Sequence, residues 1–413
     1  MRIPRCMIVL LSLFLLITIG TYINWTAPPP LPKEYTSLDH SKTWWSSAPI
    51  TTLSSVSITR QGFVKSNFSV TSLLNMTLSL KDKILIQDAY WNKKQHAIFR
   101  KLESQVNLSS SCGASDDVGS QITDFHTYPE LHKQFVLYSG CRDFPLLINQ
   151  PNKCSQNQTF LLLAIKSVPK NFDRRQAVRE TWGREMNHSG LQIRTVFLLG
   201  TDTKGTDPDL SHLVRFENDH FQDILQWDFQ DSFFNLTLKD NLFLKWVTIH
   251  CPHARFIFKG DDDVFANPLT IMQYLESLEH EKADVLYMGH VVTNASPFRE
   301  SKSKYYIPNS FYMGSYPAYA GGGGFVFSGT LAKWLYLISQ YIEFYPIDDV
   351  YTGLCFHALQ VNPQMHPEFQ TFDIAEKERD NPCTHKKLLL VHQRSTQQLI
   401  RLWRRMQDPD LQC

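Results

Sequence analysis

The feature that most restricts the fold of this chain is a regular alternation of strand-like and helix-like segments that begins at Phe160. Short apolar runs typical of buried strands occupy residues 160–165, 195–199 and 255–258, and helical patterns occupy residues 174–183 and 236–249. Strands that alternate with helices predict an α/β domain built on a mainly parallel sheet.

The N-terminus carries an uncharged apolar segment, residues 6–23, that follows Arg2 and Arg5. Its length is close to what a helix needs to cross a bilayer. Basic residues precede the segment and none follows it until Lys33, which favours a cytoplasmic N-terminus and a lumenal remainder. A cleaved signal peptide is the alternative, but no small-x-small cleavage site follows the segment. We therefore predict a single-pass type II membrane anchor.

Composition divides the rest of the chain. Ser, Thr and Pro are frequent up to about residue 84 and no helical or strand period is sustained there, which is typical of a stem. A helix is expected from Ala89. The predicted parts are a cytoplasmic tail at 1–5, the transmembrane anchor at 6–23, a lumenal stem at 24–84, an N-terminal extension packed on the main domain at 85–153, and the α/β domain at 154–413.

Eight Asn-x-Ser/Thr sequons agree with a lumenal location. Asn24 lies close to the expected membrane and Asn235 lies in an expected helix, so neither is a good acceptor. The N-glycosylation candidates are Asn67, Asn75, Asn107, Asn157 and Asn187.

The cysteines beyond the anchor contain no Cys-x-x-Cys pair, so structural disulfides are favoured over a zinc or redox site. The disulfide candidates are Cys112, Cys141, Cys154, Cys251, Cys355 and Cys383. Cys112 and Cys141 could close one loop, and Cys251 could pair with Cys154. The total past the anchor is odd, so at least one thiol is free or pairs with another chain, and Cys413 is the candidate.

Three adjacent carboxylates, Asp261, Asp262 and Asp263, follow the strand at 255–258. Ligands of open α/β sheets bind beyond the carboxyl ends of strands. A solvated acidic turn is the plain alternative, but adjacent carboxylates repel one another unless a cation offsets their charge. An EF-hand is excluded because Phe265 stands where its third ligand belongs. A hard divalent ion that bridges two phosphates fits better.

A second acidic pair, Asp348 and Asp349, precedes a helix expected at 350–359. These residues could simply cap that helix, or one of them could take a proton from an attacking hydroxyl. The glycine run at 321–324 permits close approach of backbone to a ligand, although a flexible connection is equally compatible. His392 ends an apolar strand and could ligate manganese or be structural.

Basic residues give a weaker signal. Arg175, Arg179 and Lys239 could neutralise a diphosphate, although exposed basic residues on helices often have no special role. Lys and Arg number 41 against 40 Asp and Glu, a net charge of +1, so nothing indicates binding to nucleic acid.

Seven strings together resemble, in order, the β-1,3-glycosyltransferases of glycosyltransferase family 31. They are RRQAVRETWG (174–183), FLLG (197–200), NLTLK (235–239), KGDDDVF (259–265), YAGGGGFV (319–326), DDVYTG (348–353) and LVH (390–392). Within the family, KGDDDVF, the four glycines and DDVYTG are most similar to the N-acetyllactosaminide β-1,3-N-acetylglucosaminyltransferases. AYWN at Ala89 is similar to the extension of the polylactosamine synthases.

The resemblance implies a GT-A fold in the Golgi membrane, with UDP-GlcNAc as donor and Mn²⁺ or Mg²⁺ as cofactor. It implies transfer, with inversion, to the 3-hydroxyl of terminal β-galactose, so that poly-N-acetyllactosamine chains are extended. Expected partners are glycan acceptors on glycoproteins or glycolipids, with a homodimer or a complex with other glycosyltransferases also expected.

The resemblance also implies a role for each matching residue. The implied roles are metal ligands at Asp263 and His392, donor contacts at Asp261 (to the ribose), Asp262, Arg175, Arg179, Lys239 and Gly322, the catalytic base at Asp349, and acceptor contacts at Asp348 and Tyr305. A β-1,3-galactosyltransferase of the same family, a glycoside hydrolase and a cation-dependent membrane-anchored lectin are the alternatives.

Overall fold

The structure is a computed structural model that describes residues 70–104, 112–115, 117–155, 159–202 and 208–413, all within one compact unit that begins at Leu53. The predicted tail, anchor and most of the predicted stem lie outside the described residues. In the part of the chain that the structure describes, no helix is both long and apolar enough to cross a membrane.

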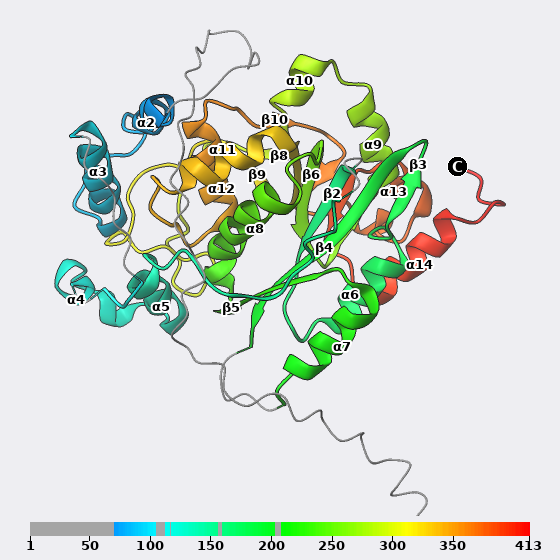
Figure 1. The fold of residues 1–413 in the computed structure, drawn as a ribbon, viewed down its shortest axis with the longest axis horizontal. Helices are drawn as coiled ribbons and strands as arrows, with labels where there is room; N and C mark the ends of the chain where they lie inside the picture. Colours follow the sequence, from blue (N-terminus) through cyan, green and yellow to red (C-terminus); the bar gives the residue numbers. More distant parts are fainter. Residues whose placement is uncertain (1–69, 105–111, 116, 156–158, 203–207) are drawn as a thin grey trace, which may run out of the picture. The chain divides into compact units, whose positions relative to one another are not determined.

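A nine-stranded sheet forms the centre of the unit (Figure 1). Its strands run in the order β1-β5-β4-β2-β6-β9-β8-β10, and β3 pairs with β4. Their bounds are β1 (Leu146–Ile148), β2 (Thr159–Lys166), β3 (Met186–His188), β4 (Leu191–Thr201), β5 (Ile224–Gln230), β6 (Phe256–Asp261), β8 (Tyr287–Val292), β9 (Tyr319–Ser328) and β10 (Gln364–Met365). The predicted strands correspond to β2, β4 and β6.

The sheet is mixed. Strands β5, β4, β2 and β6 are parallel to one another, whereas β9 is antiparallel to both β6 and β8, β1 is antiparallel to β5, and β3 is antiparallel to β4. The prediction of a mainly parallel sheet is therefore right at the centre and wrong at the flanks. No helix separates β8 from β9, so no crossover turns the chain back into parallel order.

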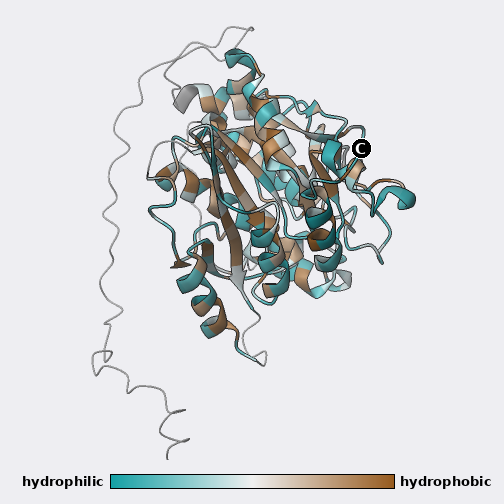
Figure 2. Cartoon of the chain, turned by 90° about the vertical axis from the view of Figure 1, so that its right-hand side faces the viewer, coloured by the Kyte–Doolittle hydropathy of each residue, from teal (hydrophilic) through white to brown (hydrophobic). Residues whose placement is uncertain are grey.

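Both faces of the sheet are buried, which explains why its strands are apolar throughout. Successive side chains of a strand point to opposite faces. Accordingly, Leu161, Leu163 and Ile165 of β2 belong to one buried cluster, and Leu162 and Ala164 to the other. Figure 2 shows the hydrophobic strands inside and hydrophilic positions on the helices around them.

Helices cover the two faces (Figure 1). One cluster draws on α8 (Leu236–His250), α11 (Gly329–Ser339) and α12 (Asp348–Ala358); the other draws on α6 (Phe172–Glu180), α9 (Pro268–Glu276) and α14 (Thr396–Met406). The shorter or peripheral helices are α4 (Val118–Gln121), η1 (Phe125–Thr127), α5 (Glu130–Tyr138), α7 (Ser211–Phe221), η2 (Phe233–Asn235), α10 (His280–Asp284), η3 (Glu376–Glu378) and α13 (Pro382–Lys387).

A small second sheet contains segments next to the acidic triplet and to His392. It has the order β11-β12-β7, formed by β11 (Phe369–Gln370), β12 (Leu390–His392) and β7 (Val264–Ala266). Because β7 follows the acidic triplet and β12 ends at His392, this sheet joins two segments that lie far apart in the sequence.

The segment before the main domain is folded from Val70 onward. The sequence predicted an irregular stem up to residue 84, but residues in this stretch form α2 (Val70–Leu78), and Leu73, Met76 and Ile84 are buried in the core. That part of the prediction is wrong, because contacts with distant elements stabilise a helix whose own sequence shows only a weak pattern.

The extension packs on the chain just before Asp348. In α3 (Tyr90–Glu103), the Trp91 indole N–H donates to the carbonyl of Phe344 (3.0 Å), and Gln95 donates to the carbonyl of Tyr341 (3.1 Å). The Trp91 ring also meets Tyr345 edge to face, with centroids 5.6 Å apart. The AYWN string thus supports the segment that leads into the second acidic pair.

Three disulfides link six of the described cysteines: Cys112–Cys141, Cys154–Cys251 and Cys383–Cys413. The first two pairings confirm the sequence-based expectation. Cys413 is bonded rather than free, and the candidate Cys355 is instead a buried free thiol. The spacing alone could not show this, because folding brings the C-terminus back beside α13.

Two of the glycosylation candidates, Asn75 and Asn187, are exposed. Asn67, Asn107 and Asn157 lie outside the described residues. Asn235 is half-buried and its side-chain amide donates to the carbonyl of Gln230 (2.8 Å), which agrees with its exclusion.

Candidate active site

The carboxyl ends of β2 and β6 bring the first group of site residues together. Asp261 is the last residue of β6, and Asp263 immediately precedes β7. Strand β12 pairs antiparallel with β7 so that His392 lies opposite Val264. This register places the imidazole of His392 beside the carboxylate of Asp263, with His392 Nε2 3.6 Å from Asp263 Oδ1.

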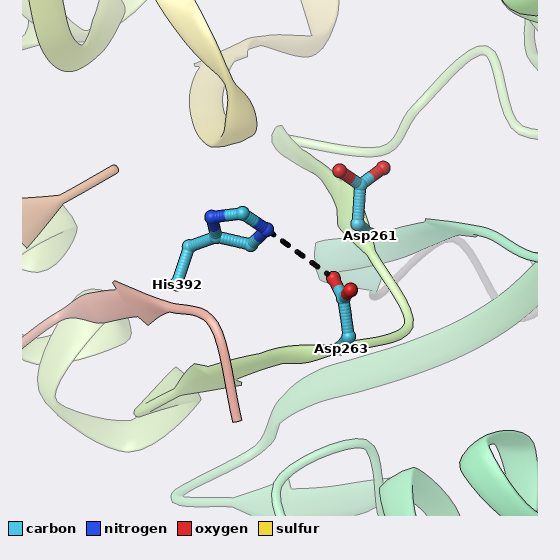
Figure 3. Close-up of side chains that lie close together, drawn as sticks. All are labelled: Asp261, Asp263 and His392. Atoms are coloured by element: carbon cyan, nitrogen blue, oxygen red, sulfur yellow. Dashed lines mark ion pairs between the residues drawn. The ribbon is translucent and has the colours of Figure 1, made fainter. Parts of the chain in front are cut away.

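Asp261, Asp263 and His392 form a set of possible metal ligands. One ligand atom from each residue lies within 4.8 Å of the others, and Figure 3 shows the imidazole of His392 and the carboxylate of Asp263 directed toward each other, with Asp261 beside them. Two carboxylates and an imidazole suit Mn²⁺, which accepts both oxygen and nitrogen ligands. The other ring nitrogen of His392, Nδ1, lies 3.2 Å from the carbonyl of Thr371. That contact orients Nε2 toward the carboxylates, as second partners of metal-binding histidines do.

The second acidic pair lies at the start of α12, where the two carboxyl groups have different environments. Asp348 is buried, and its Oδ2 forms an ion pair with Lys166 Nζ at 2.7 Å. Burial opposes its ionisation, but the nearby ammonium groups of Lys166 and Lys259 outweigh that effect and lower its pKa. We therefore take Asp348 as ionised at neutral pH.

Asp349 has the opposite shift. Burial, and next the negative charge of Asp348, raise its pKa to about 7. Its Oδ2 accepts from the backbone N–H of Gly322 (2.9 Å) and its Oδ1 from that of Val350 (2.8 Å). A carboxylate whose pKa lies near neutrality and whose orientation is fixed by backbone donors is suited to act as a general base.

The glycine run lies within β9 rather than in a loop, and it allows these side chains to approach the sheet. A Cβ at Gly322 would lie 3.2 Å from Asp349 Oδ2, and one at Gly323 would lie 3.3 Å from the Cβ of His392. Side chains at these positions would press the base and the imidazole away. Gly322, predicted to touch a donor, contacts Asp349 in this structure.

Lys166 joins the two acidic groups. It is the last residue of β2, and its Nζ lies 3.1 Å from Asp261 Oδ1, 2.7 Å from Asp348 Oδ2 and 3.4 Å from the carbonyl of Gly322. Its side chain is almost fully buried. Despite this cation, burial together with the nearby carboxylates raises the pKa of Asp261 to about 6.

Asp262 points away from the metal ligands, although it stands between them in the sequence. It is 5% exposed, and its Oδ2 accepts from Ser167 Oγ (2.7 Å) and Asn171 Nδ2 (2.9 Å), while its Oδ1 accepts from Arg174 Nη1 (3.1 Å). Both oxygens are thus occupied by protein donors. In this structure Asp262 anchors the turn, and the expected donor contact at Asp262 stays a prediction.

Comparison with known proteins agrees with this geometry. The galactosyltransferase family matches residues 173–367, which include both acidic groups. The chain is 48% identical over 342 residues to N-acetyllactosaminide beta-1,3-N-acetylglucosaminyltransferase 2 of Mus musculus, covering 79% of this chain and 86% of the relative. It is 38% identical over 420 residues to UDP-GlcNAc:betaGal beta-1,3-N-acetylglucosaminyltransferase 8 of Homo sapiens, covering 100% of both chains.

The chain belongs to the galactosyltransferase family. It is therefore a glycosyltransferase, and the resemblance drawn from the seven strings is confirmed. Its fold is a mixed α/β glycosyltransferase fold with a central sheet.

Two arginines that the family resemblance assigned to the nucleotide are structural here. Arg175 is 0% exposed; it forms an ion pair with Glu217 (2.7 Å) and also donates to the carbonyl of Pro169 (3.0 Å). Arg179 pairs with Glu217 and Asp223, each at 2.7 Å. These residues are four apart and so share the face of α6 that packs toward α7, where the protein's own carboxylates pair with them; their donor contacts stay predictions.

Lys239 is also buried and paired within the protein. It is 0% exposed, with its Nζ 2.6 Å from the carbonyl of Ser167 and 2.8 Å from Asp231 Oδ2. It donates to the residue that follows β2 and so supports the site from within the protein; its contact with a nucleotide stays a prediction.

Tyr305 lies in the segment between β8 and β9 and is 39% exposed. Its ring contacts Phe233 and Phe298, with centroids 5.4 and 5.9 Å away. Tyr319, the first residue of β9, interacts electrostatically with both Asp349 and Tyr305. The expected contact of Tyr305 with an acceptor sugar stays a prediction.

Lys166 and Arg174 are the site residues that sequence reasoning missed. Lys166 ends an apolar strand, and a cation at that point of an α/β sheet is a signal that could have been used. Arg174 stands next to Arg175, but the 100° turn between neighbouring helical residues directs it to the other side of α6. A helical projection would have separated the two.

Proposed function

We propose that this chain transfers N-acetylglucosamine from UDP-GlcNAc to the 3-hydroxyl of a terminal β-galactose in N-acetyllactosamine, with inversion, and so extends poly-N-acetyllactosamine. The observation that carries the proposal is Asp349, a carboxylate whose pKa is raised to about 7 and which Lys166 and Gly322 link to the metal-ligand cluster. The sugar and the linkage rest on the names of the relatives, and a GT-A fold is part of the proposal.

In the proposed reaction Asp349 accepts the proton of the galactose 3-hydroxyl while that oxygen attacks the anomeric carbon of the donor. The bond between the anomeric carbon and the UDP oxygen breaks in the same in-line step, and UDP leaves with the electron pair. Asp348 stays ionised and paired with Lys166, so it does not compete for the proton; its contact with the acceptor sugar is part of the proposal.

Asp263 and His392, with Asp261 alongside, would hold a divalent cation. When bound, such a cation supplies positive charge to the departing diphosphate. Asp261 also lies at the carboxyl edge of the central sheet, where we expect the ribose of the donor nucleotide. Chelation tests this assignment, since a glycoside hydrolase would keep its activity in EDTA.

The decisive experiment incubates the purified chain with a lactosamine acceptor and one of several UDP-sugars, with Mn²⁺ or with EDTA. A β-1,3-linked N-acetylglucosamine product, determined by NMR and formed only with metal, is the expected result. A galactose product would indicate the related galactosyltransferase activity. Glycan binding without any turnover would indicate a lectin.

We also propose that the enzyme is a type II protein of the Golgi membrane, with residues 6–23 as anchor. The exposed sequons at Asn75 and Asn187 support a lumenal domain, since such sites are modified in the lumen. If treatment with peptide N-glycosidase caused no shift in the gel mobility of the chain, that result would contradict this orientation.

A further inference from the structure

A cation of the protein already occupies one side of the metal-ligand cluster. Arg174 Nη1 lies 3.1 Å from Asp263 Oδ2 and 3.1 Å from Asp262 Oδ1, so one nitrogen bridges two adjacent carboxylates. The same Asp263 oxygen accepts from Gln393 Nε2 at 3.0 Å. Asp263 Oδ1 is the oxygen that faces His392.

The position of Arg174 is unusual for a purely structural arginine. It lies in the first turn of α6, where the helix dipole disfavours a positive charge. Its side chain is 37% exposed, and its Nε and Nη2 have no hydrogen-bond partner among the described residues. Arg175 next to it is fully buried and uses all three of its nitrogens. Arg174 therefore keeps donors available for an incoming anion.

We propose that Arg174 makes binding of the metal and of the nucleotide interdependent: it opposes a divalent cation at Asp263 until a nucleoside diphosphate arrives, and then donates to that diphosphate. The inference rests on the proposed function, because it takes a UDP-sugar as the anion. Arg174 is thus a positioning residue for the donor complex.

The reasoning is electrostatic. A divalent ion bound to Asp263 would lie close to the guanidinium that is bonded to the other oxygen of the same carboxylate. At the distances found within one site, the repulsion energy between a divalent ion and a guanidinium is several times RT, even at an effective dielectric constant of about 20. A diphosphate reverses the sign, because its negative charge attracts both cations. Metal and nucleotide should therefore each strengthen binding of the other, reciprocally.

A simpler role predicts the opposite sign. If Arg174 only held Asp263 in the orientation for a metal, its removal would weaken metal binding by about 10- to 100-fold with or without nucleotide, as loss of such partners does elsewhere. If it acts as proposed, its removal strengthens metal binding to the nucleotide-free protein. The sign of one change in affinity separates the two roles.

The test measures Mn²⁺ affinity of the purified full-length chain in detergent, from the EPR signal of free Mn²⁺, with and without saturating UDP. UDP chelates Mn²⁺ itself, so a protein-free titration with UDP is subtracted. The variants are Arg174→Gln, which removes the charge, and Arg174→Lys, which keeps it. Arg215→Gln on the exposed face of α7 is the matched control for loss of one surface arginine.

We expect Arg174→Gln to bind Mn²⁺ about ten-fold more tightly without UDP, and to lose at least about ten-fold in the mutual enhancement between Mn²⁺ and UDP, a change within the usual range of coupling between sites. Calorimetry should show weaker UDP binding in the same variant. Arg174→Lys should restore most of the enhancement, and Arg215→Gln should resemble the wild type.

Weaker Mn²⁺ binding by Arg174→Gln without UDP, or unchanged enhancement, would overturn the inference while leaving the proposed function intact. A wild-type chain that binds neither UDP nor Mn²⁺ would overturn the proposed function, and the inference with it.

Discussion

The pH dependence of transfer follows from the environment of Asp349. As a base, this carboxyl group works only when ionised, and its pKa is raised from 3.8 to about 7 by burial and by the charge of Asp348. The ionised fraction is then about one eleventh at one pH unit below that pKa and ten elevenths at one unit above it. The rate should therefore rise about ten-fold between pH 6 and pH 8. Bound Mn²⁺ and diphosphate carry opposite charges, so together they change the local charge little.

The variant Asp349→Asn removes the base. It should lower the rate by about 10²- to 10⁴-fold, the usual contribution of a positioned base, and abolish the dependence on pH. The measurement is the rate with limiting acceptor and saturating UDP-GlcNAc and Mn²⁺ across pH 5.5 to 8.5, each limit set about 1.5 units from a midpoint near 7. UDP affinity, measured by calorimetry, serves as the control and should stay within about two-fold of the wild type, well under the 1.4 kcal/mol of a ten-fold change.

Stability gives an independent check on the same shift. A carboxyl group whose pKa is higher in the folded state binds its proton more tightly there, so it stabilises the fold at low pH. That contribution is present below pH 3.8 and is lost as the pH rises to about 7. At about 1.4 kcal/mol per pKa unit, the loss is on the order of 4 kcal/mol before solvent screening reduces it. Asp349→Asn should not show this loss.

Two results would refute the assignment of Asp349 as base. One is a transfer rate of the wild type that stays flat from pH 5.5 to 8.5, and the other is an Asp349→Asn rate within about ten-fold of the wild-type rate.

Three other substitutions distinguish a residue that binds the metal from residues that stabilise the fold around the site. Asp263→Asn should weaken Mn²⁺ binding to the UDP-bound protein by more than about ten-fold, since it replaces a charged ligand with a neutral one; unchanged affinity by EPR would remove Asp263 from the metal site. Lys166→Met should lower the free energy of unfolding by about 3–5 kcal/mol in urea titration, because it leaves buried Asp348 without its cation; a smaller loss than 1 kcal/mol would contradict that. Arg175→Met should also lower the free energy of unfolding, because Glu217 loses one of its two arginine partners and keeps Arg179, yet it should leave UDP affinity within about two-fold; a ten-fold weaker affinity, about 1.4 kcal/mol, would support Arg175 as a donor contact.

The alternation of elements and the two acidic groups were predictable because both depend on local sequence. An apolar strand followed by Asp261 places a carboxylate at the carboxyl edge of a sheet in any α/β fold. The cluster with His392 was reached through the resemblance, since the pairing of β7 with β12 joins residues that are far apart in the sequence. The antiparallel direction of β9 relative to β8 could not be predicted, because it depends on the segment between them, which contains no helix that the sequence pattern would reveal.

The basic residues could not be assigned from the sequence for a related reason. Whether Arg175 or Arg174 faces a ligand depends on which side of α6 meets α7, and that is a tertiary contact made through Glu217. The same holds for Lys239, whose partner Asp231 lies just beyond the end of β5. Motif strings record that a basic residue belongs near a site, but burial decides whether its charge supports the fold or meets a substrate.

The acidic triplet illustrates how packing changes an electrostatic argument. Three adjacent carboxylates in the sequence suggest that a metal is needed to offset their repulsion. In the structure the protein supplies much of that charge itself, since Lys166 pairs with Asp261, and Arg174 bridges Asp262 and Asp263. The triplet can therefore persist without a bound cation. What points to a metal is the imidazole of His392, whose Nε2 is directed at Asp263 by the contact of Nδ1 with a backbone carbonyl. A metal that enters must share its carboxylate with Arg174, and that competition is why we expect its affinity to depend on the nucleotide.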